Sequence, residues 1–267
     1  MKEYKLNDKL VIRDDEMTIF SIENMKIYEF NEDGFKIINT LIDKNWQSIN
    51  EIIGTIHKEY CIYVNREIME EIESFLDELV ELKVAEKRKN EVLIQSENII
   101  IREWKKSDVY DLYEYAQSME VAENAGWKKH ENINESKKIV ELFIEEGNTY
   151  AIELICEKKV IGSIGLHQIA DDFSERIMGI VVSPYYQRKG IASEAVKLLV
   201  EYAFENEKID KIFGKYFTFN YKMENFSKNQ LFEFEEEKNV YLKAYDKIVK
   251  ERKYVLTREK YEKNKLV

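Results

Sequence analysis

Short β-favouring runs open the chain, and helical patterns follow them before residue 85. Three runs rich in β-branched and aromatic residues predict strands, and they span residues 10–13, 17–22 and 26–30. Apolar residues then recur at helical spacing in three segments that begin after Asn31, Ser48 and Asn65. These polar residues are typical helix caps, and Glu51 completes a capping-box pattern with Ser48. We therefore expect an α+β, winged-helix-like domain of three strands and three helices over residues 1–88.

A mostly polar stretch at residues 86–97 predicts a short linker, and strands and helices alternate beyond it. Helices are expected from Ser107 or Asp108, around residues 139–143 and over residues 190–205. Expected strands cover residues 99–102, 150–156, 160–168, 176–182 and 212–219, with at least one more between 240 and 256. This alternation predicts a second, α/β domain over residues 97–267.

Composition limits the class of protein. The chain has 267 residues, of which 44% are hydrophobic and 35% charged, so it has enough apolar material for a folded core. No apolar run approaches the ~20 residues that span a bilayer, and the N-terminus lacks a secretory pattern. Cys61 and Cys156 are too few for a disulfide scaffold or a metal cluster, so we expect buried free thiols. A cytoplasmic protein with no membrane partner is expected.

The net charge of -11 argues against nucleic acid as a partner. An acidic chain is a poor general ligand for phosphate backbones. The helix expected after Asn65 is itself acidic, which disfavours a winged helix that binds DNA. A dimerisation module is the other alternative for the first domain, and the sequence leaves the formation of a homodimer open.

The only proline of the chain lies before a loop that has features of a phosphate-binding site. Pro184 follows the strand at 180–182, and a basic loop with Gly190 leads into the strongest predicted helix. Backbone N–H groups at a helix N-terminus bind phosphate, and glycine permits close approach because it has no Cβ. A basic loop with one glycine is also common without any ligand, so the loop alone leaves both interpretations open.

Residues 97–260 resemble the GNAT family of N-acetyltransferases, and within it the branch of ribosomal-protein N-terminal acetyltransferases. The loop Gln187-Arg188-Lys189-Gly190-Ile191-Ala192 matches the family pattern Gln/Arg-x-x-Gly-x-Gly/Ala for acyl-CoA. Further matches are residues 99–108, residues 159–166, Asn220, and the closing segments 245–249 and 254–257. The resemblance implies a mixed central sheet and an acyltransferase that uses acetyl-CoA or a longer acyl-CoA.

The resemblance also implies which residues bind the cofactor. Pantetheine is expected to pair with the backbone of the family's fourth strand, here Ile180, Val181 and Val182. A backbone amide of this strand would bind the oxyanion of the reaction. The remaining cofactor-binding candidates are Gln187, Arg188, Lys189, Gly190, Ile191, Ala192, Ser193 and Asn220.

Three departures from the family pattern leave the catalytic residues open. Ile177-Met178 stand where many relatives carry a glutamate before the strand's glycine. Met223 replaces a serine whose hydroxyl is thought to assist the leaving thiolate, and Leu231-Phe232 replace a Gly-Phe pair.

Other side chains are therefore candidates for proton transfer. His167 on the central strand and His130 after the first helix are candidate bases, and Tyr245 is a candidate acid. For each of them, a hydrogen-bonded structural role is the alternative.

Residues 3–86 resemble PqqD-like domains, also called RiPP recognition elements, which bind leader peptides of ribosomally made precursors. The matching features are residues 6–8, 27–31, 45–49 and 75–79. An extended peptide can add to an open sheet edge as a further strand. The resemblance places this peptide between the strand that contains Ile27 and Phe30 and the helix that contains Glu67 and Glu71. An ordinary solvent-exposed face is the alternative for the acidic residues of this helix.

Together these features predict an acyl-CoA-dependent N-acyltransferase that modifies an amine of a precursor peptide recruited through its leader. One alternative is a protein N-terminal acetyltransferase with a structural first domain. Another is a peptide-binding scaffold that has lost catalysis. Acyl-CoA turnover with and without a peptide separates the three.

Overall fold

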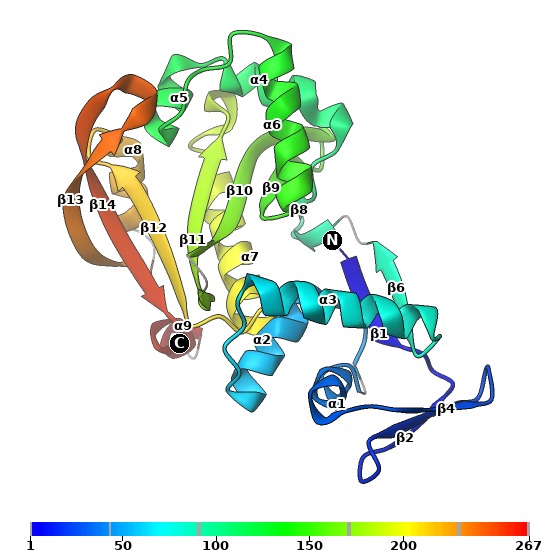
Figure 1. Cartoon of the computed structure of the whole chain (residues 1–267). Helices are drawn as coiled ribbons and strands as arrows, with labels where there is room; N and C mark the ends of the chain where they lie inside the picture. The colour runs from blue at the N-terminus through cyan, green and yellow to red at the C-terminus, as the bar shows by residue number, and fades with distance from the viewer. Residues whose placement is uncertain (1, 43, 90–91, 170–171, 229–230, 266–267) are drawn as a thin grey trace. The chain divides into compact units, whose positions relative to one another are not determined.

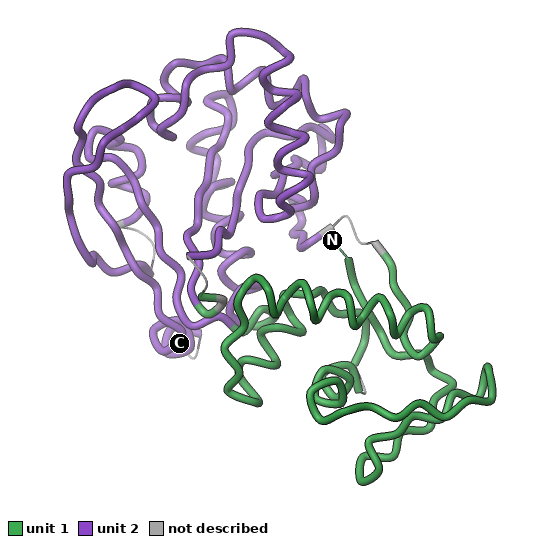
Figure 2. Tube along the Cα trace, viewed as in Figure 1, with its two compact units in different colours: residues 1–90, 170–174, 205–208 green, residues 91–169, 175–204, 209–267 purple. Residues whose placement is uncertain are grey.

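Figure 1 shows the computed structural model of the chain, which describes residues 2–42, 44–89, 92–169, 172–228 and 231–265. The chain forms two compact units (Figure 2). The first comprises residues 1–90 with residues 170–174 and 205–208, and the second comprises residues 91–169, 175–204 and 209–267. Each unit has its own hydrophobic core.

One sheet of the first unit consists of the three strands that the sequence predicts. These strands are β2 (Leu10–Arg13), β3 (Thr18–Ser21) and β4 (Lys26–Glu29), in the order β2-β3-β4. Both pairs are antiparallel, as expected for strands joined by short turns.

A second sheet of this unit corrects two expectations. It has the order β5-β1-β6 and consists of β1 (Lys2–Leu6), β5 (Gln47–Ser48) and β6 (Ala85–Lys89). The expectation of only three strands is therefore wrong. The linker predicted at 86–97 is also wrong, because β6 and β7 (Val92–Gln95) occupy much of it. The β6 sequence is polar, and its strand conformation depends on pairing with β1, more than 75 residues earlier in the chain.

Three helices complete the first unit and confirm the prediction. They are α1 (Glu32–Asn39), α2 (Ile49–Tyr60) and α3 (Arg66–Glu81). The caps Asn31, Ser48 and Asn65 each accept a hydrogen bond from the backbone N–H three residues later. The Glu51 carboxylate accepts a hydrogen bond from the Ser48 N–H, which completes the capping box.

The second unit is built on an eight-stranded mixed sheet in the order β13-β14-β12-β11-β10-β9-β8-β7. Its further strands are β8 (Ile99–Arg102), β9 (Thr149–Leu154), β10 (Lys159–Ile169), β11 (Asp172–Val182), β12 (Lys211–Phe217), β13 (Glu233–Leu242) and β14 (Lys247–Thr257). β11 and β12 are parallel, whereas β9–β10 and β12–β14 are antiparallel.

Helices cover both faces of this sheet. They are α4 (Val109–Ala116), α5 (Met119–Ala125), α6 (Ile133–Glu146), α7 (Ile191–Glu205), α8 (Tyr221–Lys228) and α9 (Arg258–Lys265). The helices expected after Ser107 or Asp108, around 139–143 and over 190–205 are confirmed as α4, α6 and α7. α5, α8 and α9 were not expected.

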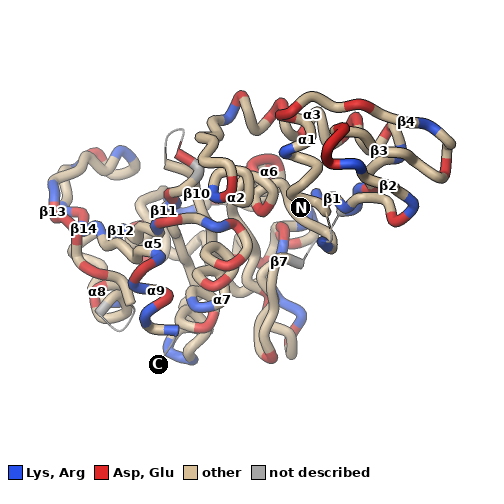
Figure 3. The backbone as a smooth tube through the Cα atoms, turned by 90° about the horizontal axis from the view of Figure 1, so that it is seen from below, with Lys and Arg blue, Asp and Glu red and all other residues tan. Residues whose placement is uncertain are grey.

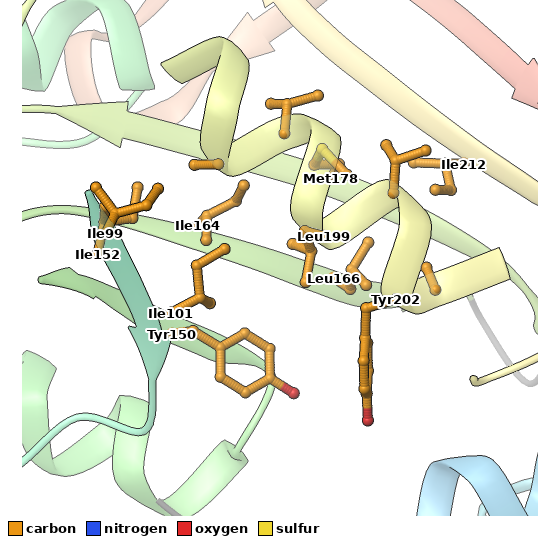
Figure 4. Packing of buried hydrophobic residues seen from close by; sticks show 14 of the residues in the cluster. Ile99, Ile101, Tyr150, Ile152, Ile164, Leu166, Met178, Leu199, Tyr202 and Ile212 are labelled. Carbon is orange, nitrogen blue, oxygen red and sulfur yellow. The ribbon is translucent and has the colours of Figure 1, made fainter. Parts of the chain in front are cut away.

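The sheet separates two hydrophobic clusters. On one face, α7 packs Leu199 against strand residues such as Ile152 and Ile164 (Figure 4). On the other face, α4 and α6 pack against the sheet in a second cluster that includes Val181 of β11. The strand ends that form the candidate site are therefore supported from both sides.

A buried charge network joins β8 to the start of α4. The Arg102 guanidinium donates to Asp108 at 2.8 and 3.0 Å and to Glu153 at 2.6 Å. Arg102 and Asp108 are both buried. Buried charges of this kind persist only when paired, so the network holds β8, β9 and α4 together.

Surface features complete the description of the two units. Acidic and basic residues are interspersed along the traces of both (Figure 3). Cys61 and Cys156 are exposed, so the expectation of buried thiols is wrong. In the described ranges, no helix has both the length and the apolar character needed to cross a bilayer.

Candidate active site

A gap opens in the sheet of the second unit where β11 and β12 stop pairing. The two strands pair from Glu175 opposite Lys211 to Met178 opposite Gly214. Beyond this point, β11 continues to Val182 and β12 to Phe217, and the described residues show no further register between them. Strand ends that separate in this way offer backbone N–H and C=O groups to a ligand that runs between them.

The free end of β11 is held on its other side by β10. A Cβ on Gly162 of β10 would lie 2.3 Å from the Val181 carbonyl oxygen, so this close approach requires glycine. The Ser183 N–H also donates to the Ile161 carbonyl oxygen at 2.8 Å. The gap therefore opens on the β12 side of β11.

The loop after β11 directs the N-terminus of α7 at this gap. Gly190 has a φ of 81° and Arg188 a φ of 61°, both in the left-handed region. The Gly190 carbonyl accepts from the Glu194 N–H at 3.0 Å, so the helix begins directly after the glycine. Apart from its two chain neighbours, no described residue has an atom within 4 Å of a Cβ placed on Gly190, so the space beside it is open to a ligand.

Side-chain hydrogen bonds hold this loop and the start of α8. Gln187 Nε2 donates to the Val182 carbonyl at 2.8 Å, and Lys222 Nζ donates to Gln187 Oε1 at 2.9 Å. Asn220 Oδ1 accepts from the Met223 N–H at 3.2 Å. Gln187 and Asn220 therefore position the backbone around the gap.

A cavity of about 800 Å³ occupies the gap and is lined by residues of both separated strands. Of the candidate cofactor residues, Lys189 is not among the described lining residues; its Nζ lies 5.0 Å from the Tyr186 ring centroid. The others all line the cavity: Ile180, Val181, Val182, Gln187, Arg188, Gly190, Ile191, Ala192, Ser193 and Asn220.

His167 is the candidate base that lies at the cavity. It belongs to β10, and its ring lies over Gly165, where a Cβ would be 2.7 Å from Nε2. Burial lowers the pKa of His167 below its usual value, and the charge of Glu146 opposes this only in part. The imidazole is therefore neutral near pH 7 and can accept a proton.

His130 and Tyr245 lie outside the described cavity lining. His130 is buried, and its Nδ1 lies 2.7 Å from Ser136 Oγ, which matches the structural alternative. The Tyr245 hydroxyl donates to the Trp127 carbonyl at 2.9 Å. Tyr245 is therefore not in the cavity lining that contains His167, although its hydroxyl bonds to Trp127, a residue of that lining.

Two tyrosines that the sequence analysis did not single out line the same cavity. The rings of Tyr216 on β12 and Tyr254 on β14 stack at 5.6 Å, and their hydroxyl oxygens lie 3.1 Å apart. Burial and the Tyr254 hydroxyl raise the pKa of Tyr216 to about 12, so this phenol keeps its proton at neutral pH. The β12–β14 register sets Tyr254 opposite Gly214 and Tyr216 opposite Arg252, and this register cannot be read from the sequence.

The candidate peptide-binding residues lie in the first unit. Ile27 on β4 is 65% exposed, and Phe30 follows the strand's end, with its ring edge-to-face with Phe75 at 6.1 Å. Glu67 and Glu71 are exposed on α3. The strand and helix that the sequence analysis paired are therefore in contact at Phe30 and Phe75.

Comparisons with known proteins relate the second unit to acetyltransferases. Residues 98–230 match the family model of the acetyltransferase (GNAT) domain. The uncharacterized N-acetyltransferase YoaA of Bacillus subtilis is 25% identical over 133 residues, which cover 48% of this chain and 75% of that protein.

Solved structures share the fold of this unit at low sequence identity. A GNAT-family acetyltransferase from Bacillus anthracis has a TM-score of 0.57 and 21% identity, covering 62% of this chain and 98% of its own. The ribosomal-protein-S5-alanine acetyltransferase of Vibrio fischeri has a TM-score of 0.54 and 19% identity, covering 62% of this chain and 96% of its own. The spermidine N-acetyltransferase of Vibrio cholerae, solved with CoA and spermine, has a TM-score of 0.55 and 16% identity, covering 62% of this chain and 99% of its own.

Proposed function

Since the chain carries a GNAT acetyltransferase domain and is an N-acetyltransferase that uses acetyl-CoA, we propose that its acceptor is an amine of a peptide recruited by the first unit. The observation that carries the proposal is the free strand edge at β4, which is flanked by the acidic helix α3. The same chain carries this edge and the acetyltransferase domain. Acyl donors longer than acetyl-CoA remain a prediction.

The residues of the gap fit an acyl-CoA. When bound, acetyl-CoA supplies the thioester carbonyl that the amine attacks. The free end of β11, with Ile180, Val181 and Val182, offers backbone groups to an extended ligand arm and a donor to the developing oxyanion. Gly190 and the first turn of α7 offer backbone N–H groups and open space to phosphates, with Arg188 in the same cavity wall.

Proton transfer is assigned to the titratable groups of the cavity. His167 takes the proton of the attacking amine, because it lines the cavity and is neutral near pH 7. The protonated Tyr216 hydroxyl, hydrogen-bonded to Tyr254, is the donor available to the leaving sulfur, since Met223 offers no hydroxyl.

Peptide recruitment is assigned to β4 and α3. An unpaired strand edge binds an extended peptide through backbone hydrogen bonds, and flanking side chains select its sequence. Ile27 supplies an exposed apolar contact, and the exposed acids of α3 favour a basic peptide. Binding at this edge would raise the local concentration of the acceptor amine at the acetyltransferase domain.

The test compares a long and a short acceptor with the intact chain. The probes are the peptide encoded by the nearest short reading frame beside the gene, the same peptide without its N-terminal half, and spermidine. Acetyl transfer is followed by mass spectrometry and by release of the CoA thiol.

We expect the long peptide to have at least a tenfold lower KM than its truncated form, and Ile27→Asp to remove this difference. Ile248→Asp is the matched control, because Ile248 is 73% exposed on β14 of the other unit. Equal KM values for the long and truncated peptides would refute recruitment.

A protein N-terminal acetyltransferase with a structural first unit is the second candidate. It is favoured by the shared fold with the Vibrio fischeri enzyme named for ribosomal protein S5. It predicts acetylation of short peptides at the α-amine, with a KM that Ile27→Asp leaves unchanged.

A further inference from the structure

The backbone groups that face the free edge of β4 can be assigned. Among the described strands, β4 pairs only with β3, in an antiparallel ladder that sets Phe20 opposite Ile27. Just beyond the strand, the Phe30 N–H donates to the Met17 carbonyl at 3.0 Å. Residues that bond to the partner strand alternate with residues that face away from it. Ile27 and Glu29 therefore direct their N–H and C=O groups to the free edge.

One face of this sheet carries an exposed apolar strip that ends at the same edge. The strand register places Val11, Phe20 and Ile27 in one row across the three strands. Val11 is 45% exposed and Ile27 is 65% exposed. Ile22 and Met25, in the turn between β3 and β4, are 49% and 73% exposed. A strand added to β4 would extend this row by one apolar side chain.

The other face of the sheet adjoins α3. The Tyr28 hydroxyl donates to the Leu82 carbonyl at the end of α3, at 3.2 Å. Phe30 contacts Phe75 of the same helix. Side chains that an added strand directs to this face therefore point towards α3.

Acidic side chains of α3 lie on the face that contacts β4. Glu71 and Glu78 are four residues before and three residues after Phe75, so the three share one helix face. Both are exposed, and neither forms an ion pair within the described part of the chain. Glu70, in contrast, is paired with Arg66 at 3.1 Å. Unpaired carboxylates beside a strand edge favour a cationic ligand.

We propose that the first unit recognises a two-faced peptide strand, with apolar side chains at alternate positions and Lys or Arg between them. Successive side chains of a strand point to opposite faces, so one set meets the apolar row and the other meets Glu71 and Glu78. The inference rests on the proposed recruitment of a peptide and adds the pattern that the peptide must have.

The experiment measures binding of labelled peptides to the full chain by fluorescence anisotropy at two salt concentrations. The reference peptide has a five-residue core, Val-Lys-Val-Lys-Val, between Ser-Gly flanks. A second peptide has the same composition with its valines contiguous. A third carries Glu in place of Lys. Two more carry N-methyl groups on alternate core amides, one set in each phase.

We expect the alternating peptide to bind at least tenfold more tightly than the contiguous one. Only one of the two N-methylated peptides should lose affinity, because only alternate amides reach Ile27 and Glu29. Glu78→Lys should weaken binding of the Lys peptide about tenfold and improve binding of the Glu peptide. Glu70→Lys is the charge-matched control. It should change the affinity for the Lys peptide and the affinity for the Glu peptide by no more than about twofold.

The possible results separate this inference from the proposed function. Equal binding of the alternating and contiguous peptides overturns the two-faced pattern and leaves recruitment standing. Equal effects of Glu70→Lys and Glu78→Lys on peptide binding overturn the assignment of the α3 face with Glu71 and Glu78 to the peptide. If neither these peptides nor the precursor-derived peptide binds the chain, the proposed recruitment fails as well.

Discussion

Replacing Gly190 by Asp and by Asn gives a direct test of the phosphate-binding assignment. Both side chains have nearly the same size, and both would occupy the open space beside Gly190. Both would also have to adopt the φ of 81°, a left-handed conformation that Asn and Asp adopt more readily than most residues with a Cβ. Because Asn and Asp share these effects, the difference between the two variants reports the added negative charge.

The magnitude follows from the charge of the ligand expected there. Two unit charges about 4 Å apart interact by about 1 kcal/mol in water and by about 4 kcal/mol at the effective dielectric constant near a protein surface. With about 1.4 kcal/mol for each tenfold change in affinity, Gly190→Asp should bind acetyl-CoA between about 5-fold and about 700-fold more weakly than Gly190→Asn.

Isothermal titration calorimetry with acetyl-CoA measures this difference, after circular dichroism has shown that both variants are folded. The difference between Asp and Asn should shrink as salt is raised, because screening weakens repulsion at an exposed loop. If the two folded variants bind acetyl-CoA with equal affinity, the assignment of a phosphate group to this loop is refuted.

Three further predictions concern other parts of the second unit. His167→Ala should lower kcat by about 10²–10⁴-fold and leave acetyl-CoA binding unchanged. In the parent protein, kcat/KM should fall as the pH drops through the His167 pKa, which lies below its usual value. This loss at low pH should persist in His130→Ala and be absent in His167→Ala. Tyr216→Phe should lower kcat about tenfold with an unchanged dissociation constant for acetyl-CoA, and an equal loss in Tyr241→Phe, outside the cavity, would contradict the assignment. Arg102→Met should lower the free energy of unfolding by about 3–5 kcal/mol in urea denaturation, because it leaves the buried Asp108 and the partly buried Glu153 without their cation; a loss below about 1 kcal/mol would show that the network is not required.

The sequence by itself determined features whose physical cause lies within a few residues. The caps Asn31, Ser48 and Asn65 each act on a backbone N–H three residues later, so the starts of α1, α2 and α3 follow from local spacing. The loop from Gln187 into α7 was also readable, because a strand, a glycine and a helix start are adjacent in the chain. Its position in the cavity wall then follows from the fold.

Only the tertiary structure decided features that depend on distant partners. The polar segment of β6 becomes a strand because β1 pairs with it. Tyr216 and Tyr254 come together through the register of two antiparallel strands, and neither side chain is distinctive in a chain with 17 tyrosines. His167 lines the cavity, whereas Tyr245 lies outside the described lining and donates to the Trp127 carbonyl. Local hydrogen bonds are set by sequence neighbours, whereas strand register and burial arise only when segments far apart in the chain pack together.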